Sequence, residues 1–122
     1  MNAITEQKSL SSWMATLVDY VRSGEPDLTN RQMALLLLVY LDAGPHTVRG
    51  LARALNVSKP VVTRALNRLG ALGYLRRQRD ESDRRNIFVV RTAEGADFLA
   101  EFGHFLAGGV SDEPHVRQRA NA

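Results

Sequence analysis

The sequence predicts a mainly helical α+β fold, a winged helix-turn-helix, and three observations support this prediction. Two short helical segments joined by a tight turn occupy residues 48–72. Two strand-like segments follow at 74–79 and 86–91, separated by six residues, which is typical of a β-hairpin, or wing. Between Arg49 and Arg91 there are eleven Lys or Arg and three acidic residues, a net charge of +8, whereas the whole chain carries only +3. Positive charge concentrated on one module indicates a surface that neutralises phosphates.

Size and composition indicate a single domain, which we expect over residues 1–109, with a flexible polar tail at 110–122. The chain has no cysteine, which excludes disulfides, thiolate metal sites and cysteine nucleophiles and fits a reducing cytoplasm, where we expect the protein. The first residues lack the pattern of a secretion signal. The longest apolar run, from Met33 to Leu41, spans about half a membrane, so we expect a buried helix and no membrane partner.

Two helices are predicted before the basic module. Apolar residues at helical spacing from Leu10 to Val21 predict an amphipathic helix over 5–22, ended by the glycine and proline of residues 23–26. Thr29 and Gln32 have the spacing of a capping box, which predicts a second helix over 30–43. That helix is apolar nearly all round, so other helices should surround it. Gly44-Pro45 ends it, and residues 46–47 form a short connector or a strand pair.

The helix-turn-helix is predicted from its caps and its inner faces. Thr47 caps a helix over 48–55, residues 56–57 make the turn, and Ser58 caps a second helix that reaches about residue 72, where Gly73 terminates it. The small residue Ala52 allows the two helices to cross closely. The remaining residues of the inner faces are Leu51, Leu55, Val62, Ala65, Leu66 and Leu69, with Val57 in the turn.

The outer face of the second helix has the chemistry needed in a DNA major groove. Arg64 can reach guanine O6 and N7, and Asn67 can pair with adenine N6 and N7. Ser58 and Lys59 lie at the helix N-terminus, where backbone amides and the helix dipole attract phosphate. The predicted DNA-binding residues of this helix are Ser58, Lys59, Pro60, Thr63, Arg64, Asn67 and Arg68. The alternative is a solvated charged face on an ordinary pair of helices.

The hairpin loop is the second predicted DNA contact. Its arginines can follow phosphates or enter a minor groove. We expect the carboxylates among them to orient guanidinium groups rather than to repel DNA, the alternative being ion pairs that neutralise one another. The predicted wing residues are Arg79, Asp83, Arg84 and Arg85, and Arg76 and Arg77 flank them.

The chain resembles the MarR family of winged helix-turn-helix transcription regulators over roughly residues 28–106. The segments that carry the resemblance are Leu51-Ala-Arg-Ala-Leu-Asn-Val-Ser-Lys-Pro-Val-Val-Thr-Arg-Ala-Leu66, Leu72-Gly73-Tyr74-Leu75, Asp80-Glu-Ser-Asp-Arg-Arg85 and Thr92-Ala-Glu-Gly95. The resemblance implies a homodimer that binds a pseudo-palindromic operator, with the second helix in the major groove and the wing arginine in the minor groove.

The chain departs from the family in its short C-terminal region. Family members usually have long C-terminal helices that interlock in the dimer, whereas here one helix over 92–107, capped by Thr92, precedes Gly108-Gly109. We therefore expect the dimer to form through the helix over 5–22 and this last helix. The predicted dimerisation residues are Trp13, Leu17, Phe98, Phe102 and Phe105. The alternative is that these side chains pack within one subunit.

Ligand binding and catalysis have weaker sequence signals. Many relatives respond to small aromatic ligands, and Trp13, Tyr20, Tyr40 and His46 are the candidate lining residues, although such residues at helical spacing also form cores. The protein could instead be a constitutive repressor or respond to a protein partner. The histidines lie far apart and no phosphate-binding loop is present, so we expect no metal, no cofactor and no catalysis.

Taken together, these patterns predict a sequence-specific regulator of transcription that binds double-stranded DNA, acting as a repressor and binding an inverted-repeat operator as a homodimer. The alternatives are a winged-helix module for protein interaction and a ligand-independent architectural DNA binder. The basic face argues against the interaction module, because an interaction face would expose aromatic residues or leucines.

Overall fold

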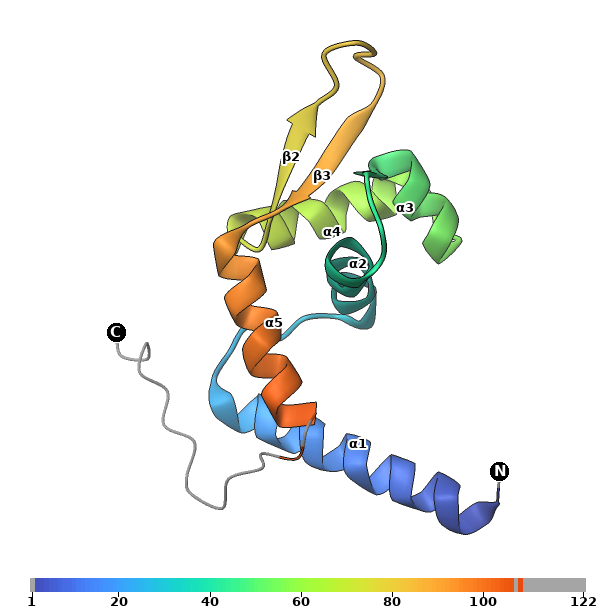
Figure 1. Cartoon of the computed structure of the whole chain (residues 1–122), viewed down its shortest axis with the longest axis vertical. Helices are drawn as coiled ribbons and strands as arrows, with labels where there is room; N and C mark the ends of the chain where they lie inside the picture. The colour runs from blue at the N-terminus through green and yellow to red at the C-terminus, as the bar shows by residue number, and fades with distance from the viewer. Residues whose placement is uncertain (1, 107, 109–122) are drawn as a thin grey trace. The chain divides into compact units, whose positions relative to one another are not determined.

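The computed structural model describes residues 2–106 and Gly108, and Figure 1 shows the order of its elements. Over these residues the chain forms five helices and a small antiparallel sheet, as predicted for a winged helix-turn-helix. The elements are α1 (Ala3–Ser23), α2 (Asn30–Leu41), β1 (His46–Thr47), α3 (Val48–Leu55), α4 (Lys59–Ala71), β2 (Leu75–Arg79), β3 (Ile87–Arg91) and α5 (Ala93–Leu106). The tail expected at 110–122 lies outside the described residues. None of the described helices is long and apolar enough to cross a membrane.

The described residues divide into two compact units. Leu28–Phe98 form one unit, and the residues before and after them form the other. The first unit contains residues 47–91, the helix-turn-helix and hairpin that the sequence predicts as the DNA-binding core. The grouping of residues 1–109 as a single domain remains a prediction.

Capping side chains explain where the helices begin. The Thr29 hydroxyl accepts a hydrogen bond from the Gln32 amide at 3.1 Å, and the Gln32 side-chain oxygen accepts one from the Thr29 amide at 2.9 Å, which completes the predicted capping box. The Thr47 hydroxyl accepts from the Gly50 amide at 3.0 Å, and the Ser58 hydroxyl accepts from the Val61 amide. These bonds satisfy amides that have no partner inside the helix. Helix α2 ends at Leu41, earlier than the predicted residue 43, because the backbone is already extended at Asp42.

The sheet contains one more strand than the predicted hairpin. Strand β3 lies between β1 and β2 and is antiparallel to both. His46 pairs with Val89 in the register of β1 and β3, and Leu75 pairs with Arg91 in the register of β2 and β3. The short connector at 46–47 therefore joins the helix-turn-helix to the wing through the backbone.

A cluster of hydrogen bonds fixes the base of the hairpin inside the unit Leu28–Phe98. The Tyr40 hydroxyl accepts from the Thr92 amide at 2.9 Å and donates to the Tyr74 carbonyl oxygen at 2.7 Å. The Thr92 hydroxyl accepts from the Gly95 amide at 2.9 Å and donates to the Gly73 carbonyl oxygen at 2.6 Å. A Cβ on Gly95 would overlap the Tyr40 hydroxyl and the Tyr74 carbonyl oxygen, so only glycine allows this close approach. The cluster ties α2, the beginning of β2 and the beginning of α5 together.

The second unit pairs α1 with the end of α5. The Tyr20 ring meets the Phe102 ring edge to face, with centroids 5.4 Å apart. The Tyr20 hydroxyl donates to the Pro26 carbonyl oxygen, and the buried Thr16 hydroxyl donates to the Ser12 carbonyl oxygen at 3.1 Å. Much of the apolar surface of α1 remains exposed: Ile4, Leu10, Trp13, Met14, Leu17, Val18 and Val21.

Candidate nucleic-acid interface

Helix α4 presents its predicted outer face to solvent. Val62, Ala65, Leu66 and Leu69 are buried on the inner face. The helix period therefore turns the intervening polar residues outward. All seven predicted residues of this face are exposed: Ser58, Lys59, Pro60, Thr63, Arg64, Asn67 and Arg68.

The turn between α3 and α4 holds that face in place. Asn56 adopts a left-handed backbone with φ of 56°, a conformation that asparagine tolerates better than most residues. The Val57 amide then donates to the Ala52 carbonyl oxygen at 3.0 Å. Because Ala52 is small and buried, α3 can lie close to α4. The turn thus fixes the direction in which α4 begins.

The first turn of α4 favours an anion. Lys59 is its first residue, Pro60 follows, and no acidic residue occurs there. Pro60 costs no hydrogen bond, because a first-turn amide has no partner within the helix. The positive end of the helix dipole and the Lys59 ammonium group together suit a phosphate oxygen.

Asn67 is linked to the wing by a hydrogen bond that the sequence analysis missed. The Arg77 guanidinium donates from Nη2 to Asn67 Oδ1 at 2.9 Å. Both side chains are exposed, and α4 packs against β2 in this region. Strand alternation could have indicated the contact, because Arg77 lies on the same side of β2 as Leu75, which is buried in the core.

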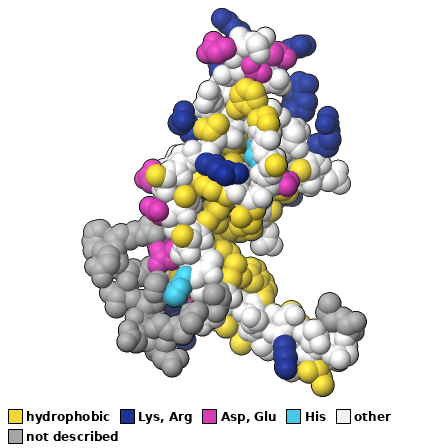
Figure 2. Space-filling model, viewed as in Figure 1, with side chains coloured by type: hydrophobic (Ala, Val, Ile, Leu, Met, Phe, Trp, Pro, Cys, Tyr) yellow, Lys and Arg dark blue, Asp and Glu magenta, His cyan; other side chains and the backbone are white. Residues whose placement is uncertain are grey.

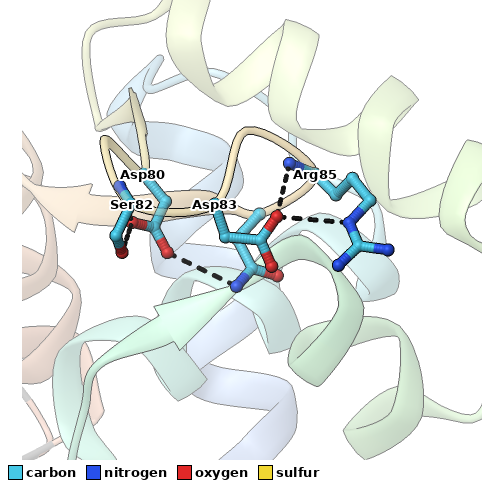
Figure 3. A network of polar contacts seen from close by, with 5 residues as sticks. Asp80, Ser82, Asp83 and Arg85 are labelled. Atoms are coloured by element: carbon cyan, nitrogen blue, oxygen red, sulfur yellow. Dashed lines mark hydrogen bonds and ion pairs between the residues drawn. The ribbon is translucent and has the colours of Figure 1, made fainter.

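Side chains of the loop itself shape the wing tip (Figure 3). The Asp80 carboxylate accepts from the Ser82 hydroxyl at 2.8 Å, from the Ser82 amide at 2.9 Å and from the Asn86 side-chain amide at 3.4 Å. The bond from the Ser82 hydroxyl, followed by the one from its amide, lowers the pKa of Asp80 below the ordinary value of 3.8. The Asp80 carboxylate therefore closes the loop through these hydrogen bonds.

Asp83 orients one wing arginine, as expected. Its Oδ1 accepts from Arg85 Nε at 3.2 Å and from the Arg85 amide at 3.1 Å (Figure 3). The contact between the two side chains is a single hydrogen bond, from Arg85 Nε to Asp83 Oδ1. Arg79 and Arg84, the other predicted wing arginines, are exposed. In the view of Figure 2, Lys and Arg side chains surround the hairpin and carboxylates lie at its tip.

The predicted dimerisation residues fall into two groups. Trp13 and Leu17 are 44% and 40% exposed on α1. Phe98, Phe102 and Phe105 are buried within the chain, with Phe98 stacked on the Tyr74 ring at 4.5 Å. The three phenylalanines are therefore buried within a single chain and the exposed apolar residues lie on α1, and the dimerisation role of all five residues remains a prediction.

The four candidate ligand-lining residues have different surroundings. The hydroxyls of Tyr20 and Tyr40 are hydrogen bonded to backbone atoms. Trp13 lines a shallow hollow with Lys8, Thr16 and other residues of the same unit, and His46 contacts the Asp42 carbonyl oxygen at 3.0 Å. Among the described residues, no group of three or more His, Asp or Glu side chains could hold a metal ion.

Comparisons with known proteins give one family and one fold. A sequence model described as the MarR family matches residues 27–86. The transcriptional regulator Tm0710 from Thermotoga maritima is 27% identical, with a TM-score of 0.70 over 88% of this chain and 72% of that chain. The regulator BldR from Sulfolobus solfataricus is 26% identical, with a TM-score of 0.59 over 98% of this chain and 92% of that chain.

A third solved structure contains nucleic acid. Reduced AbfR bound to DNA is 22% identical to this chain, with a TM-score of 0.62 over 86% of this chain and 76% of that chain. No curated protein sequence gives a significant match.

Proposed function

The chain belongs to the MarR family of winged helix-turn-helix transcription regulators, and from this premise we propose that it represses transcription by binding an inverted-repeat operator as a homodimer. Members of this family are transcription regulators rather than enzymes. The observation that carries the proposal is the pairing of an exposed recognition face on α4 with an arginine-rich wing in one unit.

Each part of the basic module has a role in the proposed complex. Arg64 contacts a guanine edge from α4 in the major groove, and Ser58 and Lys59 anchor the start of α4 to a phosphate. The wing arginines Arg84 and Arg85 contact the backbone or the neighbouring minor groove. The net charge of +8 over residues 49–91 supports this arrangement, as does the similar fold of AbfR bound to DNA.

The homodimer is supported by the exposed face of α1. Seven large apolar side chains there are at least 40% exposed, which is costly for a free surface in water. A second copy of α1 would cover them. A two-fold symmetric dimer presents two copies of α4, so we expect half-sites about one helical turn, roughly 34 Å, apart in an inverted repeat of about 16–20 base pairs.

Repression follows from occupancy in this proposal. A dimer whose recognition helices and wings cover an operator inside a promoter excludes RNA polymerase from the same DNA.

The test is selection of bound fragments from the genomic DNA of the source organism, followed by a salt titration on a selected duplex. The fragments should share an inverted repeat near promoters. Affinity should fall by about 10³–10⁵ between roughly 50 and 200 mM salt if six to ten phosphates are contacted. An absence of duplex binding at low salt would favour a protein-interaction module, and binding without a shared sequence would favour an architectural role.

A further inference from the structure

The hydrogen bond between Arg77 and Asn67 has a consequence for base recognition. A guanidinium group carries only donors, so the atom of Asn67 that faces it must be the carbonyl oxygen. Arg77 Nη2 lies 2.9 Å from Asn67 Oδ1, in agreement with this chemistry. The Asn67 amide is thereby fixed in one of its two flipped orientations, with its NH₂ group directed away from Arg77.

This orientation changes what Asn67 offers to a base. Recognition of adenine by asparagine needs both edges of the amide, because Oδ1 accepts from adenine N6 while Nδ2 donates to N7. Arg77 occupies one lone pair of Oδ1 and holds the amide so that its NH₂ group points away from β2, and the outward edge therefore offers donors. Guanine presents two acceptors in the major groove, O6 and N7, and so matches that edge.

We propose that Arg77 is a specificity-determining residue that acts through Asn67, making Asn67 select guanine instead of adenine at the base pair it faces. The proposal rests on the proposed function, because it needs α4 to lie in a major groove. It replaces the pairing of Asn67 with adenine that the residue type alone suggested.

The position of Arg77 supports this role over a purely electrostatic one. Side chains alternate along β2, and Arg77 lies on the same side of the strand as the buried Leu75, toward α4. Arg76 is also exposed and lies on the opposite side of the strand. The two neighbouring arginines therefore carry the same charge but differ in access to Asn67, and Arg76 is a matched control.

The experiment measures base preference with duplexes that differ at one operator position. The position read by Asn67 is first identified as the one where Asn67→Ala removes discrimination. Wild type should prefer guanine over adenine there. Arg77→Met keeps an unbranched apolar stem but removes the donors, and should shift the guanine-to-adenine affinity ratio toward adenine by about tenfold, the scale of one lost base-specific pair. Arg76→Met should leave the ratio unchanged, and Arg77→Lys, which keeps a donor and the charge, should retain much of the guanine preference.

A double variant separates action through Asn67 from other effects. In the Asn67→Ala background, Arg77→Met should no longer change the base preference. If Arg77→Met weakens all duplexes equally and leaves the ratio unchanged, Arg77 contacts phosphate and the proposal is wrong. A wild-type preference for adenine at this position would also overturn it. Loss of all sequence preference in the wild type would instead contradict the proposed function, so the two failures are distinguishable.

Discussion

Gly95 allows a tyrosine hydroxyl and a backbone carbonyl to meet at the base of the hairpin. The Tyr40 hydroxyl and the Tyr74 carbonyl oxygen occupy the space where any other residue would place its Cβ. The Thr92 hydroxyl accepts a hydrogen bond from the Gly95 amide at the start of α5, and it also donates one to the Gly73 carbonyl oxygen. The Thr-x-x-Gly segment of the resemblance thus has a physical reason: it joins α5 to the hairpin and to α2.

Substitution of Gly95 by alanine should destabilise the protein. The new methyl group overpacks a buried site, and we expect the free energy of unfolding to fall by about 1–3 kcal/mol. Gly103→Ala is the matched control on the same helix, because a Cβ there meets nothing within 4 Å. The control should be neutral or stabilise the protein by up to about 1 kcal/mol. Urea denaturation followed by circular dichroism measures both, and equal stability of the two variants would contradict the steric argument.

Arg64 and Arg84 should respond differently to truncation. Arg64→Ala removes the proposed base contact, so affinity for the operator should fall by about 1–3 kcal/mol and the base preference at one position should relax. Arg84→Ala removes the proposed phosphate contact, so all duplexes should weaken together and the salt slope should decrease by about one. Binding titrations on a panel of single-base variants distinguish them. Uniform weakening by Arg64→Ala would reassign Arg64 to phosphate.

The sequence was sufficient for most single-residue features that depend on near neighbours. Exposure of Arg64 and the caps at Thr29 and Ser58 follow from local spacing, and the structure agrees with them. The bonds of Tyr40 to Thr92 join residues 52 positions apart. No local pattern reports a contact at that separation. The bond between Arg77 and Asn67 joins residues only ten positions apart, and strand alternation places Arg77 on the side of β2 that carries Leu75.

At the scale of elements, the wing loop is stabilised by its own side chains. Asp80 accepts three hydrogen bonds from Ser82 and Asn86, and Asp83 holds Arg85. The lowered pKa of Asp80 means that the charged carboxylate is favoured in the folded loop. Its contribution to loop stability is therefore complete above the ordinary pKa of 3.8 and is lost as the pH falls through the lower folded value.

Removal of the Asp80 carboxylate should loosen the wing. We expect Asp80→Ala to accelerate hydrogen exchange at the Ser82 amide and to weaken DNA binding severalfold without a change in base preference, because the loop must then be ordered on the DNA. Glu81→Ala removes the same charge from an exposed neighbour and should bind DNA as well as or better than wild type. Nuclear magnetic resonance and binding titrations measure these effects. Equal behaviour of the two variants would mean that charge, not loop geometry, matters at this tip.

Helix starts were easier to predict than pairings between elements. The predicted and observed beginnings of α2, α3 and α4 agree within one residue, because a cap is a property of four consecutive residues. The pairing of β1 with β3 joins His46 to Val89, and it depends on how the chain folds back rather than on either segment. The connector could therefore be suspected as a strand from the sequence, but its partner could not.

At the scale of the whole molecule, helical periodicity indicated apolar faces on two helices but not what covers each one. The structure buries Phe98, Phe102 and Phe105 within the chain and leaves Trp13 and Leu17 partly exposed. An apolar stripe looks the same in sequence whether its partner is in the same subunit or in another. Only the folded chain separates the apolar side chains that it buries itself from those that it leaves exposed.

A charge on the exposed face of α1 should dissociate the proposed dimer. Met14 is 60% exposed there, and Met14→Glu should shift the protein toward monomer at tens of micromolar because a buried, unpaired carboxylate is costly at an interface. Ala15→Glu adds the same charge to the same helix at an exposed position off that face, and should leave the dimer intact. Sedimentation velocity measures both. A wild-type monomer under the same conditions would remove the dimer from the proposal.

The self-closed loop between β2 and β3 also bears on the thermodynamics of association. Its contacts form when the chain folds, so conformational entropy of the bonded loop residues is lost before any duplex is present. Binding to DNA then requires little reorganisation of this loop, and a larger share of the attraction between the loop and the DNA groove appears as net affinity.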